Sequence, residues 1–180
     1  MWLNKKILVP TDFSEPSKAA ADVASELATR FGVPLVVVHS HLAPLGAYTP
    51  VPVAPRTDYV QALEDTAHEL LEEEARRLRG RNVEVTTLLR FGFASQEILA
   101  VVQELDVGLI VMGTHGRRGL PRALLGSVAE KIVRLSPVPV LTVHAGSSQT
   151  QAAVTARSED TESDATATNT NRRRAEGRAE

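Results

Sequence analysis

Four small residues in the second half of the chain have the spacing of a phosphate-binding loop. They are Gly113, Gly116, Gly126 and Ser127, and they lie between an apolar run and a helical pattern. Glycines let the backbone approach a ligand closely, and the N–H groups at the start of a helix favour negative charge. Residues 113–128 therefore predict a site for the phosphates of a nucleotide.

The same residues also allow structural interpretations. Gly113 and Gly116 could form only a tight turn, but a tight turn does not require Gly126 and Ser127 further on. Ser127 and Glu130 have the spacing of a capping box, in which the serine hydroxyl bonds to the backbone of the first helical turn. A capping hydroxyl can also turn toward a ligand. We therefore favour the phosphate site and expect Ser127 to cap the helix as well.

The charged residues near the loop indicate binding more than catalysis. His115 and three arginines could neutralise phosphates, although for the arginines an exposed loop position is an equal alternative. No Gly-Lys-Ser/Thr follows the glycines, so the lysine that reaches the β- and γ-phosphates in a Walker loop is missing. The histidines have no metal-ligand spacing. We therefore predict no catalytic residue and no metal-binding residue.

The elements that position the loop alternate between strands and helices. The apolar patterns predict strands at 5–10, 33–39, 83–89, 107–112 and 138–143, and helices at 58–79, 95–105 and 127–135. They also predict a first helix that Ser14 can cap, with apolar positions from Ala20 to Phe31 and Gly32 at its end. Such alternation is typical of an α/β fold with a five-stranded parallel sheet and helices on both faces. We expect the flavodoxin-like, or Rossmann-like, strand order 3-2-1-4-5.

In such a sheet the ligand binds at the carboxyl ends of the strands, where the winding direction reverses. The reversal falls between the first predicted strand and the fourth. Pro10, Thr11 and Asp12 stand at the end of the first strand, so we expect them beside the glycine loop. Asp12 could instead cap the first helix, and we favour the role at the ligand.

Prolines indicate that the last predicted strand lies at a sheet edge and that residues 41–57 form a loop. The last predicted strand contains Pro139, which has no N–H to donate and therefore indicates a sheet edge. An exposed apolar edge needs a cover, so we predict a homodimer through Val138–Val143. Four prolines between 41 and 57 predict an irregular loop there.

The composition changes after His144. Residues 145–180 contain no aromatic residue and one valine. Such a segment buries too little apolar surface to offset the entropy cost of ordering it. We therefore divide the chain into an α/β domain at 1–144 and a disordered polar tail at 145–180.

The overall composition narrows the class of protein. A net charge of −2 gives no general reason to expect nucleic acid or a membrane surface as a partner. The chain has no cysteine, which excludes disulfides and thiol chemistry. No apolar run approaches the roughly 18 residues of a membrane helix, and the run near the N-terminus is too short for a signal peptide. We expect a cytoplasmic protein.

These segments resemble the universal stress proteins. The ATP-binding members of that family have the loop G-x2-G-x9-G-[ST], which Gly113, Gly116, Gly126 and Ser127 match at every position. The likeness extends to KILVPTDFS at 6–14, VMGTHG at 111–116 and VPVLTV at 138–143. It covers residues 1–144 and excludes the tail.

The resemblance implies an ATP site whose adenosine end lies near the first two strands. It implies that Asp12 meets the adenosine, that Pro10 and Thr11 line the pocket, and that the backbone of Val38 meets the adenine edge.

The resemblance places the rest of the nucleotide along the loop. It implies that Met112 and Gly113 lie under the ribose and phosphates, and that the phosphate chain is surrounded by Gly116, Gly126, Ser127 and Val128. Ala129 departs from the family pattern, in which a hydroxyl residue often follows the motif, so one phosphate contact is expected to be missing.

The function that the resemblance implies is a nucleotide-dependent regulatory module of the stress response that binds ATP, with or without Mg²⁺. Two alternatives stay open. One is a slow ATPase or autophosphorylating enzyme that uses the same pocket, and the other is an interaction protein that binds no nucleotide. Phosphate release with multiple turnovers that vanish in Asp12→Ala would favour the enzyme. The residues do not distinguish ATP from AMP or identify a regulatory protein partner.

Overall fold

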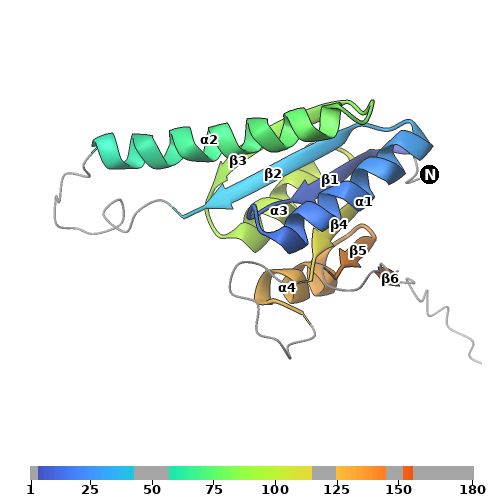
Figure 1. The fold of residues 1–180 in the computed structure, drawn as a ribbon. Helices are drawn as coiled ribbons and strands as arrows, with labels where there is room; N and C mark the ends of the chain where they lie inside the picture. The colour runs from blue at the N-terminus through green and yellow to red at the C-terminus, as the bar shows by residue number, and fades with distance from the viewer. Residues whose placement is uncertain (1–3, 43–56, 115–124, 145–151, 156–180) are drawn as a thin grey trace, which may run out of the picture.

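A computed structural model describes residues 4–42, 57–114, 125–144 and 152–155 of the chain, and at 57–59 and 152–155 only the backbone (Figure 1). In chain order the elements are β1 (Lys6–Pro10), α1 (Glu15–Phe31), β2 (Leu35–His41), α2 (Thr57–Arg79), β3 (Val85–Phe91), α3 (Ala94–Glu104), β4 (Val107–Gly113), α4 (Ser127–Leu135), β5 (Val140–Val143) and β6 (Ala152–Thr155). Gly116, His115, the arginines of the glycine loop and most of the predicted tail and proline-containing loop lie outside the described residues.

The strands form one sheet with the order β3-β2-β1-β4-β5-β6. The first five are parallel to one another, which confirms the predicted order 3-2-1-4-5. Every predicted helix is present, and α4 has the predicted bounds. The first helix begins at Glu15, directly after Ser14, which is the residue predicted to precede it, and Pro16 stands in its first turn.

The sixth strand corrects the prediction that the last strand is a sheet edge. β6 pairs antiparallel with β5, so β5 lies between β4 and β6. The predicted polar tail therefore contributes four residues to the sheet. β5 itself begins at Val140 rather than at Val138. Pro139 has no N–H, and only its carbonyl joins the sheet, where it accepts from the N–H of Ile110 at 3.0 Å.

The helices cover both faces of the sheet, as predicted (Figure 1). Side chains of each inner strand alternate between two cores. In β4, Leu109 and Val111 pack with residues of α1 and α2. Ile110 and Met112 pack with residues of α3 and α4. The inner strands are therefore apolar on both faces, as parallel strands covered by two helical layers must be.

α1 lies close to the sheet because its buried face consists of small side chains. Ala20, Ala21, Ala24 and Ala28 are all buried. The helix ends at Gly32, whose φ of 64° is left-handed and whose N–H donates to the carbonyl of Ala28. Because α1 lies so close, only a residue without a side chain fits at the end of β4.

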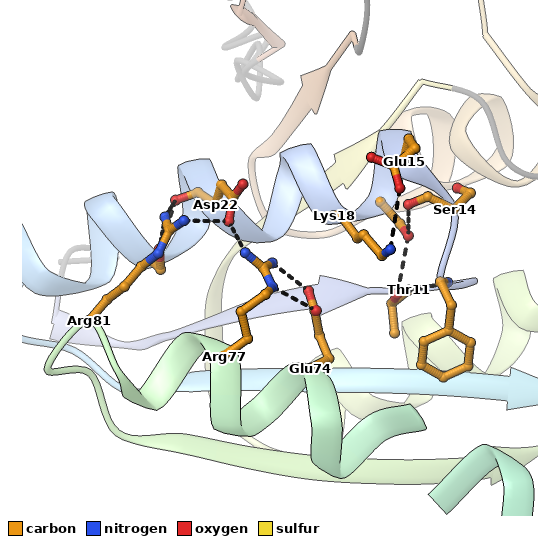
Figure 2. Close-up of polar contacts among 11 residues, drawn as sticks. Thr11, Ser14, Glu15, Lys18, Asp22, Glu74, Arg77 and Arg81 are labelled. Carbon is orange, nitrogen blue, oxygen red and sulfur yellow. Dashed lines mark hydrogen bonds and ion pairs between the residues drawn. The ribbon is translucent and has the colours of Figure 1, made fainter. Parts of the chain in front are cut away.

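An ion-pair network joins α2 to α1 (Figure 2). Arg77 donates from Nε and Nη2 to the two carboxylate oxygens of Glu74, at 2.9 and 2.7 Å, and from Nη1 to Asp22. Asp22 also pairs with Arg81 at 2.8 Å. The hydrogen bonds from Arg77, first to Glu74 and then to Asp22, raise the pKa of its guanidinium. The Glu74 side chain is only 7% exposed, so loss of Arg77 would leave a buried carboxylate without this partner.

Candidate functional site

The carboxyl ends of three neighbouring strands bring Pro10, Val38 and Gly113 to the same end of the sheet. β1 lies between β2 and β4. Pro10 is the register partner of Val38 in β2, and β4 ends at Gly113. The turn after β1 and the loop after β4 therefore leave adjacent strands at the same edge. This is the reversal point at which ligands bind in open α/β sheets.

The turn after β1 is held by the polar atoms of Thr11. Its N–H donates to the carbonyl of Val38 at 2.9 Å, and its Oγ1 accepts from the N–H of Phe13 at 3.0 Å. Ser17 gives its hydroxyl proton to the carbonyl of Ser14, so Thr11 is the donor in the 3.1 Å bond between the two hydroxyls. Thr11 is buried, and its hydroxyl and the Val38 carbonyl are already used within the fold.

Asp12 is held in one orientation by Ser14. Its Oδ1 accepts from the N–H of Ser14 at 3.1 Å and from the Ser14 hydroxyl at 2.5 Å. Ser14 is the residue that precedes α1, but its side chain makes no capping bond to the helix. Phe13, between the two, has a φ of 64°, which is uncommon for a bulky residue. The turn thus presents a half-buried carboxylate whose position is fixed.

His39 supports this turn from β2, although the sequence assigned it no role. Its Nδ1 lies 2.8 Å from the carbonyl oxygen of Thr11, and its ring packs against that of Phe13 with 4.5 Å between centroids. The ring row continues through His41 to Phe91 at the end of β3. The contact of His39 with Thr11 joins β2 to the turn after β1. The spacing of residues within one strand does not indicate such a contact.

Gly113 is a glycine because α1 passes close to the end of β4. A Cβ atom there would lie 2.9 Å from both the carbonyl carbon and the carbonyl oxygen of Pro16. Real Cβ atoms do not come this near to backbone. The sequence interpretation gave this glycine to the ligand, whereas the structure gives a reason within the protein itself.

Thr114 connects the two ends of the loop after β4. Its N–H donates to the carbonyl of Val143 at 3.0 Å, and its carbonyl accepts from the N–H of Gly126 at 2.7 Å. Its Oγ1 lies 3.1 Å from Nδ1 of His144. The residue that follows β4 is therefore hydrogen-bonded to the residue that precedes α4, at the buried Thr114. Sequence reasoning missed this role, because the partners of Thr114 lie far along the chain.

The start of α4 differs from the predicted capping box. Gly126, not Ser127, precedes the helix, and no side chain caps it. Ser127 is the first helical residue, and its side chain is exposed. The first N–H groups of a helix have no acceptor within the helix, so Ser127 and Val128 present theirs at this end. Ala129, where a hydroxyl was expected, is buried in the core of α3 and α4.

The starts of α1 and α4 both lie at the end of β4. The first turn of α1 touches the end of β4 through Gly113, and the first turn of α4 is joined to the same strand through Thr114. Helix N-termini favour negative charge. Within 4–42, 57–114 and 125–144, no group of three or more His, Cys, Asp or Glu could hold a metal.

None of the described helices has the length and apolar character to span a membrane.

Comparison with known proteins identifies the family to which this fold belongs. The family model described as "Universal stress protein family" matches residues 3–144. The chain belongs to the universal stress protein family. The predicted membership is therefore confirmed, and the match ends at the residue where the predicted domain ends.

Individual relatives cover the same part of the chain. Universal stress protein MJ0531 of Methanocaldococcus jannaschii is 31% identical over 142 residues, which are 78% of this chain and 82% of the relative. The solved structure of the protein MJ0577 superposes with a TM-score of 0.65 and 27% identity, over 81% of this chain and 99% of the other.

Some structures of the same fold were solved with a nucleotide. One is the universal stress protein of Archaeoglobus fulgidus in complex with dAMP, with a TM-score of 0.58 and 24% identity over 78% of this chain and 98% of the other. Another is a universal stress protein in complex with cAMP, with a TM-score of 0.59 and 22% identity over 78% and 97%. At these identities the likeness to this chain is one of fold.

Proposed function

We propose that this universal stress protein binds an adenine nucleotide, with ATP as the principal ligand, at the carboxyl ends of β1 and β4. One observation carries the proposal. The hydrogen bond from Gly126 N–H to the carbonyl of Thr114, at 2.7 Å, joins the start of α4 to the end of β4. It places the N–H groups of Ser127 and Val128 at the reversal point, where phosphates bind in this class of fold.

The two ends of the nucleotide have different surroundings in this proposal. The phosphates lie at the start of α4, and the exposed Ser127 hydroxyl adds a donor. The N–H of Gly126 is occupied by Thr114, so Gly126 contributes close approach rather than a hydrogen bond. The adenosine lies toward Pro10 and Asp12. The complexes of relatives with dAMP and cAMP support an adenine base.

We further propose that the nucleotide is held as a regulatory signal in the stress response of the cytoplasm. Asp12 belongs to the adenosine end of the proposed site, where two hydrogen bonds from Ser14 hold its Oδ1. No Gly-Lys-Ser/Thr follows the glycines, so the lysine that reaches the β- and γ-phosphates in a Walker loop is missing. The alternative is that the protein slowly hydrolyses ATP or phosphorylates itself. In either case a bound Mg²⁺ would lie beside the phosphates.

The homodimer through Val138–Val143 stays a proposal with an added condition. The outer edge of β5 is paired with β6, so two copies can join there only when β6 leaves the edge. Val154→Pro would weaken β6, because proline removes an N–H donor and disfavours a paired strand. Sedimentation velocity should then show more dimer than in the unchanged chain. An unchanged or smaller dimer fraction would count against this surface.

Calorimetric titration with ATP, AMP and GTP tests the nucleotide site. We expect the unchanged chain to bind ATP, and Ser127→Asp to weaken ATP by at least about tenfold, because like charges brought together cost several kcal/mol. An aspartate in the first turn suits the helix dipole, so α4 should not be destabilised.

The matched control is Gln96→Asp. It adds the same charge to the first turn of α3, which follows β3 at the far side of the sheet. This variant should bind ATP as the unchanged chain does. Failure of the unchanged chain to bind any adenine nucleotide would refute the proposed function.

A further inference from the structure

We propose that Thr114 and His144 are positioning residues of the phosphate site. Together with Val143 and Gly126 they form a clasp that fixes the start of α4 relative to the end of β5. The effect of the clasp on nucleotide affinity rests on the function proposed above. Its effect on the protein alone does not.

The clasp consists of three hydrogen bonds that meet at one residue. Thr114 N–H donates to the Val143 carbonyl at 3.0 Å, and the Thr114 carbonyl accepts from Gly126 N–H at 2.7 Å. The third bond joins Thr114 Oγ1 and His144 Nδ1 at 3.1 Å. Two of the bonds lead to the end of β5 and one leads to the start of α4, so the position of α4 depends on Thr114.

The side chain of Thr114 needs its partner because it is 8% exposed. A buried hydroxyl without a hydrogen bond destabilises the folded state. His144 supplies one such bond, at 3.1 Å, from the residue directly after β5. The imidazole therefore holds the Thr114 side chain, and through it the backbone carbonyl that receives the Gly126 N–H.

A clasp of this kind alters affinity through the fraction of molecules in which it is closed. A ligand that needs the start of α4 in place binds only that fraction, and the apparent dissociation constant rises as the fraction falls. A contact that is merely structural lowers the unfolding temperature and leaves the dissociation constant unchanged. The two roles therefore give different measurements.

The test compares Thr114→Val, which keeps the shape and removes the hydroxyl, with Thr114→Ser, which keeps the hydroxyl. Thr142→Val is the matched control, because Thr142 is another buried threonine of this region and lies outside the clasp. His144→Ala and the double variant Thr114→Val/His144→Ala complete the set. For each protein we would measure the ATP dissociation constant by calorimetry and the unfolding temperature without nucleotide.

We expect Thr114→Val and His144→Ala each to weaken ATP binding about threefold to tenfold, the range that one neutral hydrogen bond spans. Thr114→Ser should stay within about twofold of the unchanged chain on the same scale, and Thr142→Val should not alter affinity. The double variant should bind no more weakly than Thr114→Val, because both changes remove one interaction. Unchanged affinity in Thr114→Val, or losses that multiply in the double variant, would overturn the proposal.

Hydrogen exchange of the Gly126 amide, measured without nucleotide, separates this proposal from the proposed function. The amide should exchange faster in Thr114→Val than in Thr114→Ser. Equal exchange in the two variants would refute the clasp. If the unchanged chain binds no nucleotide but its Gly126 amide responds in this way, the proposed function fails and the clasp stands.

Discussion

Gly113→Ala should destabilise the protein even when no ligand is present. The added Cβ would stand 2.9 Å from two backbone atoms of Pro16 and 3.0 Å from its Cβ. Pro16 lies in the first turn of α1, where its ring and the helix leave little freedom to move. Relief therefore requires a shift of α1 against the sheet, and that shift disturbs the small buried side chains by which the helix packs.

The size of the effect follows from two opposing terms. Forcing an extra methyl into a packed site costs about 1–3 kcal/mol. Alanine in a strand recovers about 0.5–1 kcal/mol, because it loses less conformational entropy than glycine. The two terms leave a net loss centred on about 1 kcal/mol, and each kcal/mol corresponds to roughly 2–4 °C in unfolding temperature.

Two other glycines serve as controls, one for the available space and one for the backbone conformation. A Cβ at Gly80 would lie 3.4 Å from the Arg77 carbonyl, an ordinary contact, so Gly80→Ala should stay within roughly 0.5 kcal/mol of the unchanged chain. At Gly32 a Cβ would meet nothing within 4 Å, but the φ of 64° is left-handed and should cost about 1 kcal/mol in Gly32→Ala.

Urea unfolding of the three variants without nucleotide decides the matter. If Gly113→Ala is as stable as Gly80→Ala, the packing explanation of Gly113 is wrong and its glycine is free to serve the ligand. If Gly113→Ala is destabilised as expected, loss of nucleotide binding in a Gly113 variant does not identify a ligand contact.

Three further predictions follow from other parts of the molecule. Arg77→Ala should lower the free energy of unfolding by about 2 kcal/mol in urea titrations, because the buried Glu74 carboxylate loses a bidentate partner. A decrease smaller than that caused by breaking an exposed ion pair would contradict this explanation. The pKa of Glu72 is lowered, first by the hydrogen bond from Thr87 and then by that from Arg79. The stabilisation from this shift is therefore present above the unfolded pKa and is lost as pH falls through the folded pKa. NMR titration of Thr87→Val should show the Glu72 pKa rising toward its ordinary value. Finally, ATP at a hundred times its dissociation constant should add about 2.7 kcal/mol to the free energy of unfolding, which a thermal-shift assay would detect.

The sheet order could be predicted because strands alternate with helices along the chain and the inner strands are apolar on both faces. Strands such as Val107–Gly113 are apolar throughout, which only a doubly covered parallel strand requires. β6 could not be predicted in this way. Its sequence, Ala-Ala-Val-Thr, has one strongly strand-forming residue besides a threonine, and its pairing depends on the edge that β5 offers.

The strand ends that bear the proposed site could be predicted, but their contacts could not. The predicted order places the ends of β1 and β4 side by side, as the structure has them. The capping box failed because the same Ser and Glu spacing fits a helix that begins one residue earlier, after a glycine. The contact of His39 with Thr11 joins different strands, and a pattern read within one strand does not contain it.

Gly113 and Thr114 are consecutive, and each determines the position of a different helix. The first sets how closely α1 approaches β4, and the second ties α4 to the same strand end. Because the residues are adjacent on one peptide, the two helix N-termini cannot move apart without distorting the end of β4. A phosphate at the start of α4 would be held by the dipole of that helix, and a change at Gly113 would reach it through the end of β4. We therefore expect the affinity for phosphate to depend on the packing of β4 as much as on any side chain that touches the nucleotide.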